Sequence, residues 1–294
     1  MLKKILCFIG WFRSKPCLVL LVGLLLMTQD LSAQATPKNV PMGAEPSVVP
    51  SSQTSREVPE EIAPDMIEPG VQLDPLDSPH PIPWNWVMAT HNELSASRRF
   101  GTRYYRSQSL VSPDGQYAAY SRIQLQGQPE LYYSRVTSVM FVENLQTGDL
   151  RTITPSSPLA DNPLISHEEG DMPGTISILI PVSWSKSSDR LLARQFEGML
   201  STSDASDYAV VWDRKQNRIS TIAPERIEYS YAVLLGWSQS HPDQVLFRAG
   251  ELGDVRPPVW AVNLNRQTSL ALEDEPTIYG QVVNQVWAGP QARW

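Results

Sequence analysis

Short segments of alternating apolar and polar residues, separated by turn residues, dominate the chain from Phe100 onward. The stretch Ser107–Arg122 is the clearest example, because an apolar run, a Pro-Asp-Gly turn and a second alternating run follow one another. Period-two alternation bounded by such turns is typical of β-strands joined in hairpins. We therefore predict strands at 104–105, 116–123, 130–133, 136–143 and 150–154.

The pair formed by an apolar residue and a serine recurs three times, each time followed by Asp and an apolar strand. The copies start at Val111-Ser112, Trp184-Ser185 and Trp237-Ser238, and they carry Asp114, Asp189 and Asp243 at the strand entry. Because the aspartate lies at the strand entry in every copy, at slightly shifted spacing, we interpret Asp114 as a turn residue and not as a catalytic acid. The spacing between copies varies, which is typical of loop insertions in a repeated unit.

A second motif also occurs three times. In each copy an apolar strand runs into an anchor residue, Asn144, Asp213 or Asn263, and the chain then turns into another strand. Gly148 and Asn217 lie four residues after their anchors, and both residue types tolerate the left-handed backbone of a tight hairpin. Gln267, at the same spacing in the third copy, fits this role less well. A repeated four-stranded unit of about 40 to 50 residues indicates a stacked or radial β architecture.

The Ser-Pro-Asp-Gly turn at 112–115 and the Trp-Ser starts of the other copies resemble the WD40-like (PD40) blades of the β-propeller domain of the Tol system's periplasmic component. They are also similar to the propellers of prolyl-oligopeptidase-type proteins. The resemblance covers about 107–272 and implies an all-β fold, a small or incomplete β-propeller of about three to four four-stranded blades. It implies no activity, because the shared motif is a turn.

The number of blades is left open by the sequence. Closed propellers usually need at least four blades, whereas three good copies are present, and 100–107 and 277–287 supply further strands. A four-bladed ring, an incomplete ring and stacked sheets that form no ring are the alternatives, and we favour a small or incomplete propeller. An incomplete ring would expose sheet edges, which favours dimerisation.

The N-terminus has the order of features of a secretory signal peptide at 1–33. Four cations precede or flank an unbroken apolar run, Cys17–Met27, and small residues follow at Ala33 and Ala35. This pattern predicts a periplasmic or secreted protein. The alternative is an uncleaved N-terminal membrane anchor, to which the apolar stretch Ile5–Phe12 would contribute. Both cysteines, Cys7 and Cys17, lie within residues 1–33, so cleavage would leave a chain with no disulfide and no cysteine nucleophile.

The distribution of prolines predicts where the linker ends and the folded domain begins. Eleven of the 25 prolines lie between Pro37 and Pro83, which disrupts any periodicity and predicts a disordered linker at 34–83, either a tether or a plain spacer. A β-propeller-like domain then spans 84–294. Its first element is a short helix at 84–97, because apolar residues recur there at helical spacing. His91 lies on the apolar face and is interpreted as a packed histidine.

Two serine motifs come near to catalytic signatures without completing them. Gly236-Trp-Ser238-Gln-Ser240 lacks the last glycine of a nucleophile elbow, and a strand follows it where the elbow needs a helix. Ser183-Trp-Ser-Lys186 matches Ser-x-x-Lys, but neither companion motif of that enzyme class follows. We therefore assign no catalytic residue.

Metal and ligand motifs are equally incomplete. His167-Glu-Glu-Gly-Asp171 lacks the second histidine of a zinc site, so a solvated insertion between blades is favoured over weak metal binding. Ser203-Asp-Ala-Ser-Asp207 could offer oxygens to calcium, but two carboxylates in a turn are a common feature. We expect no cofactor and no metal. Eight aromatic residues would suffice to line a carbohydrate or peptide groove, although their equivalent repeat positions favour core packing: Tyr104, Tyr105, Tyr132, Tyr133, Trp184, Trp212, Trp237 and Trp260.

Charge narrows the range of partners. The net charge of −7 disfavours nucleic acid, whose phosphates would be repelled. We expect an exported, non-enzymatic binding or scaffolding module for a protein or peptide of the cell envelope. The alternatives are a hydrolase acting on cell-wall or carbohydrate material, for which Ser238 and His167 would be the residues to test, and a purely structural accessory domain.

Overall fold

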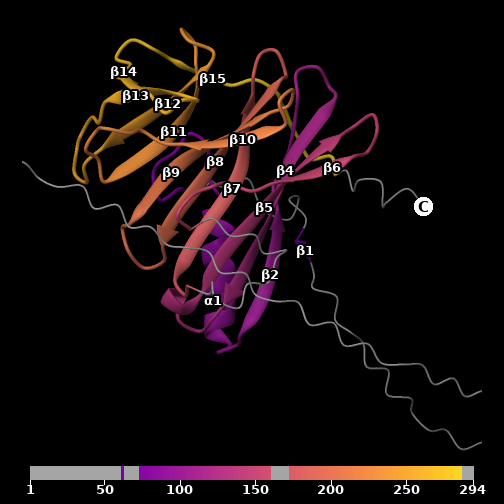
Figure 1. Cartoon of the computed structure of the whole chain (residues 1–294). Coiled ribbons are helices and arrows are strands. Elements are labelled where there is room, and N and C mark those ends of the chain that lie inside the picture. Colours follow the sequence, from indigo (N-terminus) through magenta and orange to yellow (C-terminus); the bar gives the residue numbers. More distant parts are fainter. Residues whose placement is uncertain (1–60, 63–72, 160–171, 287–294) are drawn as a thin grey trace, which may run out of the picture. The chain divides into compact units, whose positions relative to one another are not determined.

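The computed structural model describes residues 61–62, 73–159 and 172–286 (Figure 1). The chain divides into two compact units, Met1–Ser55 and Arg56–Trp294, and every described residue belongs to the second. The expected signal peptide at 1–33 and the segment His167–Asp171 lie outside the described residues. None of the described helices is long and apolar enough to cross a membrane.

Three four-stranded antiparallel meanders follow one another along the chain, in agreement with the all-β expectation. The first consists of β3 (Ser109–Val111), β4 (Tyr117–Gly127), β5 (Arg135–Asn144) and β6 (Leu150–Ile153). The second consists of β7 (Thr175–Trp184), β8 (Arg190–Met199), β9 (Ala205–Asp213) and β10 (Arg218–Ile222). The third consists of β11 (Tyr231–Ser238), β12 (Gln244–Gly250), β13 (Val259–Asn263) and β14 (Thr268–Leu270).

The first two meanders merge into one sheet, because β5 pairs in parallel with β7 at Val136 and Ile176. Its order is β1-β2-β4-β5-β7-β8-β9-β10, with β3 on β4 and β6 on β5. Here β1 (Glu61–Ile62) adds in parallel to β2 (Gly101–Arg106). The third meander forms a separate sheet, and side chains from β8 and β9 pack with those of β11 and β12 in a shared core.

A C-terminal strap, residues 276–283, runs past the first strand of every meander. It begins with β15 (Pro276–Thr277), which pairs with β11, continues through a bridge between Tyr279 and Trp184 of β7, and ends with β16 (Gln281–Val283), which pairs with β3. The strap therefore links all three meanders. The sequence pattern had shown only further strands in this region, because pairing partners more than 100 residues away leave no local signal.

Helix α1 (Trp84–Ala96) forms where the sequence predicts it and packs on β4. It buries Trp86, Val87 and His91, and the side chains of Trp86 and Val87 form a core with those of the long strands β4, β5, β7 and β8. His91 is 6% exposed, as expected of a packed histidine. Trp84 and Met88, which the helical spacing placed on the apolar face, are only partly buried.

One local expectation is wrong. Residues 130–133 were expected as a strand but contain a 3-10 helix, η2 (Leu131–Tyr133), because Ser134 folds back so that its Oγ accepts the N–H of Gln128 at 2.9 Å. In the third hairpin the left-handed residue is Arg266 (φ 63°) and not Gln267, which agrees with the poorer fit expected of Gln267. The other two hairpins follow the prediction, with φ of 76° at Gly148 and 51° at Asn217.

Candidate functional site

A buried arginine organises the centre of the described fold. Arg194 lies on β8 with a fully buried side chain, and its Nη1 is 2.6 Å from Oδ2 of Asp74. Its Nε is 2.8 Å from Oδ1 of Asp207, which is fully buried on β9. The guanidinium also donates to the carbonyl oxygen of His80 at 2.7 Å. Because an unpaired charge is costly to bury, these partners are needed to keep Arg194 inside the protein.

Asp74 fastens the segment 73–83 to this centre. Its carboxylate accepts the backbone N–H groups of Leu76 and Ile82, both at 3.0 Å, besides the bonds from Arg194. His80 Nε2 lies 3.0 Å from the carbonyl oxygen of Leu235 on β11. The segment is thus an ordered part of the fold, which corrects the linker boundary expected at residue 83. The proline-rich sequence predicted a disordered linker here, because the partners of Asp74 lie far along the chain and leave no local pattern.

The pKa values of Asp74 and Asp207 shift in opposite directions, although both carboxylates pair with Arg194. Burial raises the pKa of Asp207 to about 6, and the charge of Arg194 offsets this only in part. Burial also acts to raise the pKa of Asp74, but the hydrogen bonds and charge of Arg194 outweigh it, so the pKa is lowered. Burial lowers the pKa of His80. The Asp74 carboxylate is therefore the partner that stays ionised as the pH falls.

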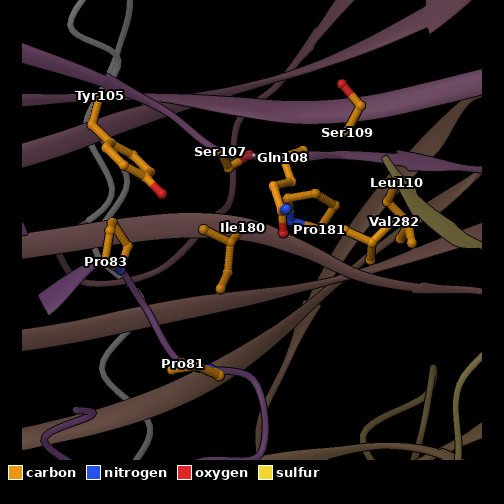
Figure 2. A pocket seen from close by; sticks show the side chains of 10 residues that line it. All are labelled: Pro81, Pro83, Tyr105, Ser107, Gln108, Ser109, Leu110, Ile180, Pro181 and Val282. Carbon is orange, nitrogen blue, oxygen red and sulfur yellow. Dashed lines mark hydrogen bonds between the residues drawn. The ribbon is translucent and has the colours of Figure 1, made fainter. Parts of the chain in front are cut away.

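The anchored segment forms one wall of a cavity of about 300 Å³, which we call the proline pocket (Figure 2). Its residues come from the N-terminal segment, from β2 and β3 with their connection, from β7 and from the strap: Pro81, Pro83, Tyr105, Ser107, Gln108, Ser109, Leu110, Ile180, Pro181 and Val282. Four stretches that are distant in sequence thus build one site. In Figure 2 the Tyr105 hydroxyl group points inward from β2.

The lining of the proline pocket is neutral. Burial raises the pKa of Tyr105, so its hydroxyl group remains protonated at neutral pH. Ser107 Oγ donates to the carbonyl oxygen of Gln108 at 2.9 Å, and Ser109 Oγ donates to that of Gln285 at 3.0 Å. Arg106 Nη2 donates to Ser109 Oγ at 3.1 Å, and a guanidinium cannot take up a proton. Among the described residues no hydrogen bond joins Ser107 or Ser109 to a general base. The pocket offers apolar surface and a few neutral hydrogen-bonding groups, which suits binding.

The repeated serines close turns. Ser112 Oγ donates to Asp114 at 2.5 Å, and Ser185 Oγ donates to Asp189 at 2.8 Å. The pKa of Asp114 is lowered, since its hydrogen bonds from Ser112, Gln116 and Arg214 outweigh its burial. Asp114 also pairs with Arg214 of the second meander at 2.8 Å. These contacts agree with the interpretation of Asp114 as a turn residue.

The third copy departs from the expected pattern. Ser238 Oγ donates to Asp274 at 2.5 Å and accepts the N–H of His241 at 2.7 Å. Asp243 therefore does not take the place of Asp114, because it follows its serine by five residues, compared with two and four in the other copies. Asp274, just before the strap, takes its place. The near match to a nucleophile elbow at Ser238 is thus a buried turn.

The remaining candidate residues have structural surroundings. Ser183 Oγ donates to the carbonyl oxygen of Trp184 and accepts the N–H of Tyr279, each at 2.8 Å, so Lys186 is not its partner. Asp207, expected in a turn, belongs to the buried charge network. Within the described ranges no three His, Cys, Asp or Glu residues gather as metal ligands do.

The eight aromatic candidates differ in burial, and Tyr104, Tyr105 and Trp260 are partly buried. Trp184, Trp212 and Trp237 are buried, and Trp184 donates its indole N–H to the carbonyl oxygen of Leu110 at 3.2 Å, which is core packing. Tyr132 and Tyr133 are about half exposed. Of the aromatic candidates, Tyr105 alone lines the proline pocket. Sequence reasoning missed Pro81 and Pro83, whose only signal was their position immediately before a helix.

Neither protein-family models nor curated proteins give a match to this chain.

Proposed function

We propose that the chain is a non-enzymatic binding module of the cell envelope, and that the proline pocket receives an uncharged, extended peptide segment of a partner protein. The observation that carries this proposal is the composition of the pocket wall, in which three prolines, a tyrosine and aliphatic side chains surround neutral hydrogen-bonding groups. Grooves lined by aromatic side chains are a recurring receptor for extended peptides in the polyproline II conformation, and Tyr105 supplies an aromatic side chain here.

The strap supports the same function. Within the described part of the chain, β16 pairs with β3 alone, so its second edge carries backbone groups that a peptide strand can use. Val282 of β16 lines the pocket and is 59% exposed. Strand addition along β16 would place side chains of the incoming peptide beside the pocket.

We propose further that the three meanders are blades of an incomplete WD40-like propeller, with β3, β7 and β11 as the innermost strands. Support comes from the strap, which pairs with these three first strands in turn. Export to the periplasm is the environment that the N-terminal sequence favours. The hydrolase alternative has less support, because the hydroxyl group of Ser238 is buried and bound to Asp274.

Site-specific photo-crosslinking in living cells tests the binding proposal. A photoreactive amino acid at Gln108, which lines the pocket, is expected to form an adduct with an envelope protein. The same amino acid at Gln216, an exposed turn residue outside the pocket, is the matched control. Val282→Arg should abolish the adduct by placing a charge at the pocket, whereas Val255→Arg, at a site that is 93% exposed, should not. Equal amounts of adduct from Gln108 and Gln216 would contradict the proposal.

A further inference from the structure

A second cavity lies between the first and second meanders, away from the proline pocket. We call it the arginine pocket, because Arg151 of β6 and Arg214 after β9 both line it, together with Tyr117, Asp149 and Asn217. Its volume is about 280 Å³. That is at the lower limit of ligand-binding cavities, so it suits one small ring and not a long chain.

Two rings that line this pocket, those of Tyr117 and Trp212, belong to an aromatic cluster. The ring centroids of Tyr117 and Trp212 are 6.0 Å apart in an edge-to-face arrangement, and each ring also contacts Trp184. Trp212 is 4% exposed, so the cluster belongs to the core and holds the pocket wall in place. Aromatic walls are suited to the apolar faces of small rings.

The two arginines differ in their charge balance. Arg214 lies 4.3 Å from the centroid of the Tyr117 ring and is held by Asp114 at 2.8 Å and Gln116 at 2.7 Å. Arg151 lies 5.8 Å from the Trp212 ring centroid, and no ion pair among the described residues involves it. Arg151 is exposed at the pocket, so its guanidinium is available to a carboxylate.

Other polar groups in the pocket retain hydrogen-bonding capacity. Asn217 Oδ1 faces the indole N–H of Trp212 at 3.4 Å, which leaves its amide N–H groups as donors. Tyr117 Oη accepts the Asn144 amide at 3.1 Å, and its own proton is available. One oxygen of Asp149 accepts from Thr147 at 2.7 Å, and the carboxylate has further capacity for ligand hydroxyl groups.

We infer that the arginine pocket binds an acidic sugar, with Arg151 taking the carboxylate, Asp149 and Asn217 the hydroxyl groups, and the aromatic cluster supporting the ring. The pocket combines a cation that has no ion-pair partner among the described residues with several neutral donors and one carboxylate, and a hydroxylated ring bearing a carboxylate presents the complementary groups. This site is separate from the proline pocket and goes beyond the peptide binding proposed there.

Calorimetric titration of the exported chain with D-glucuronate and with D-glucose tests the inference. Glucuronate should bind at least tenfold more tightly, as expected when one charge-assisted hydrogen bond distinguishes two ligands. Arg151→Gln should abolish this preference. Arg218→Gln, which removes an exposed arginine outside the pocket, should leave it within about twofold.

Three outcomes would overturn the acidic-sugar site. The first is equal affinity for glucuronate and glucose, or no binding of either. The second is an equal loss in the two arginine variants, which would show attraction by overall charge. The third is binding of acetate as tight as that of glucuronate, which would show that the sugar ring contributes nothing. Asp149→Asn is a further check on folded protein, because it should weaken both sugars and retain the preference.

Discussion

Nη1 of Arg194 lies 2.6 Å from Oδ2 of Asp74, and this contact joins residues that are 120 positions apart in the sequence. It attaches the segment before helix α1 to the middle of β8. Pro81 and Pro83 reach the wall of the proline pocket because this attachment places the segment between β8 and β11. The charge network therefore supports the candidate site without lining it.

Arg194→Met should destabilise the protein by about 3–5 kcal/mol, because Asp74 and Asp207 would remain buried without a cation. Urea unfolding measures the loss. The matched control is Arg190→Gln, which removes a partly exposed ion pair with Asp213 at 3.6 Å and should cost at most about 1 kcal/mol. A triple variant that also carries Asp74→Asn and Asp207→Asn should recover part of the loss. Similar losses for the two single variants would contradict the role assigned to Arg194.

Asp207 should make the folded state more stable as the pH falls from about 7 to about 4. Its folded pKa of about 6 exceeds the ordinary value near 3.8, so the folded state binds the proton first in this range. The lowered pKa of His80 acts in the opposite direction, since the unfolded chain then binds that proton first. The comparison is therefore made with Asp207→Asn, which retains His80. Thermal unfolding at several pH values should show that the unfolding temperature of the wild type rises relative to that of the variant as the pH falls. A difference that stays constant with pH would contradict this prediction.

Asp74 should affect the pH dependence of folding stability in the opposite direction. Its lowered folded pKa contributes stability above about pH 4, and that contribution is lost as the pH falls through the folded value. Asp74→Asn should therefore cost stability at neutral pH and much less at about pH 2. Urea titrations of wild type and variant at the two pH values test this. An equal cost at both values would show that the charge of Asp74 is not what matters.

Gly280→Ala should release the C-terminal strap. Gly280 has φ of 108°, and an added Cβ would lie 2.8 Å from the carbonyl oxygen of Val111. Gly253 has a similar φ of 99° with open space around it, so Gly253→Ala reports the backbone strain alone, roughly 1–2 kcal/mol. We expect the larger loss at Gly280, together with faster proteolytic removal of the strap detected by mass spectrometry. Equal behaviour of the two variants would argue against close packing of the strap.

Ser238→Ala should lower stability by about 1–2 kcal/mol, because the Asp274 carboxylate and the His241 N–H each lose a partner. Ser203→Ala, at an exposed position, is the control and should change stability by less than about 0.5 kcal/mol. Chemical denaturation measures both. If Ser238→Ala were as stable as the control but lost a hydrolytic activity, the turn interpretation would fall and the hydrolase alternative would gain.

Features that depend on neighbouring residues could be predicted from the sequence. Gly148 and Asn217 have the left-handed backbone that their hairpins require, and helix α1 ends one residue before the predicted limit at Ser97. The three repeat copies correspond to the three meanders. In each case the information is local, because turn geometry and hydrophobic spacing act over a few residues.

Contacts between distant residues could be decided only by the tertiary structure. Asp274 replaces Asp243 as the partner of Ser238, and residues 73–83 fold onto Arg194 although their prolines had predicted a linker. Both candidate pockets combine residues from separate parts of the chain, so no spacing rule could have revealed them. The sequence alone thus determined the repeated hairpins, through short-range backbone preferences. The fold decided which charges, prolines and rings meet, since burial and pairing depend on the whole packed chain.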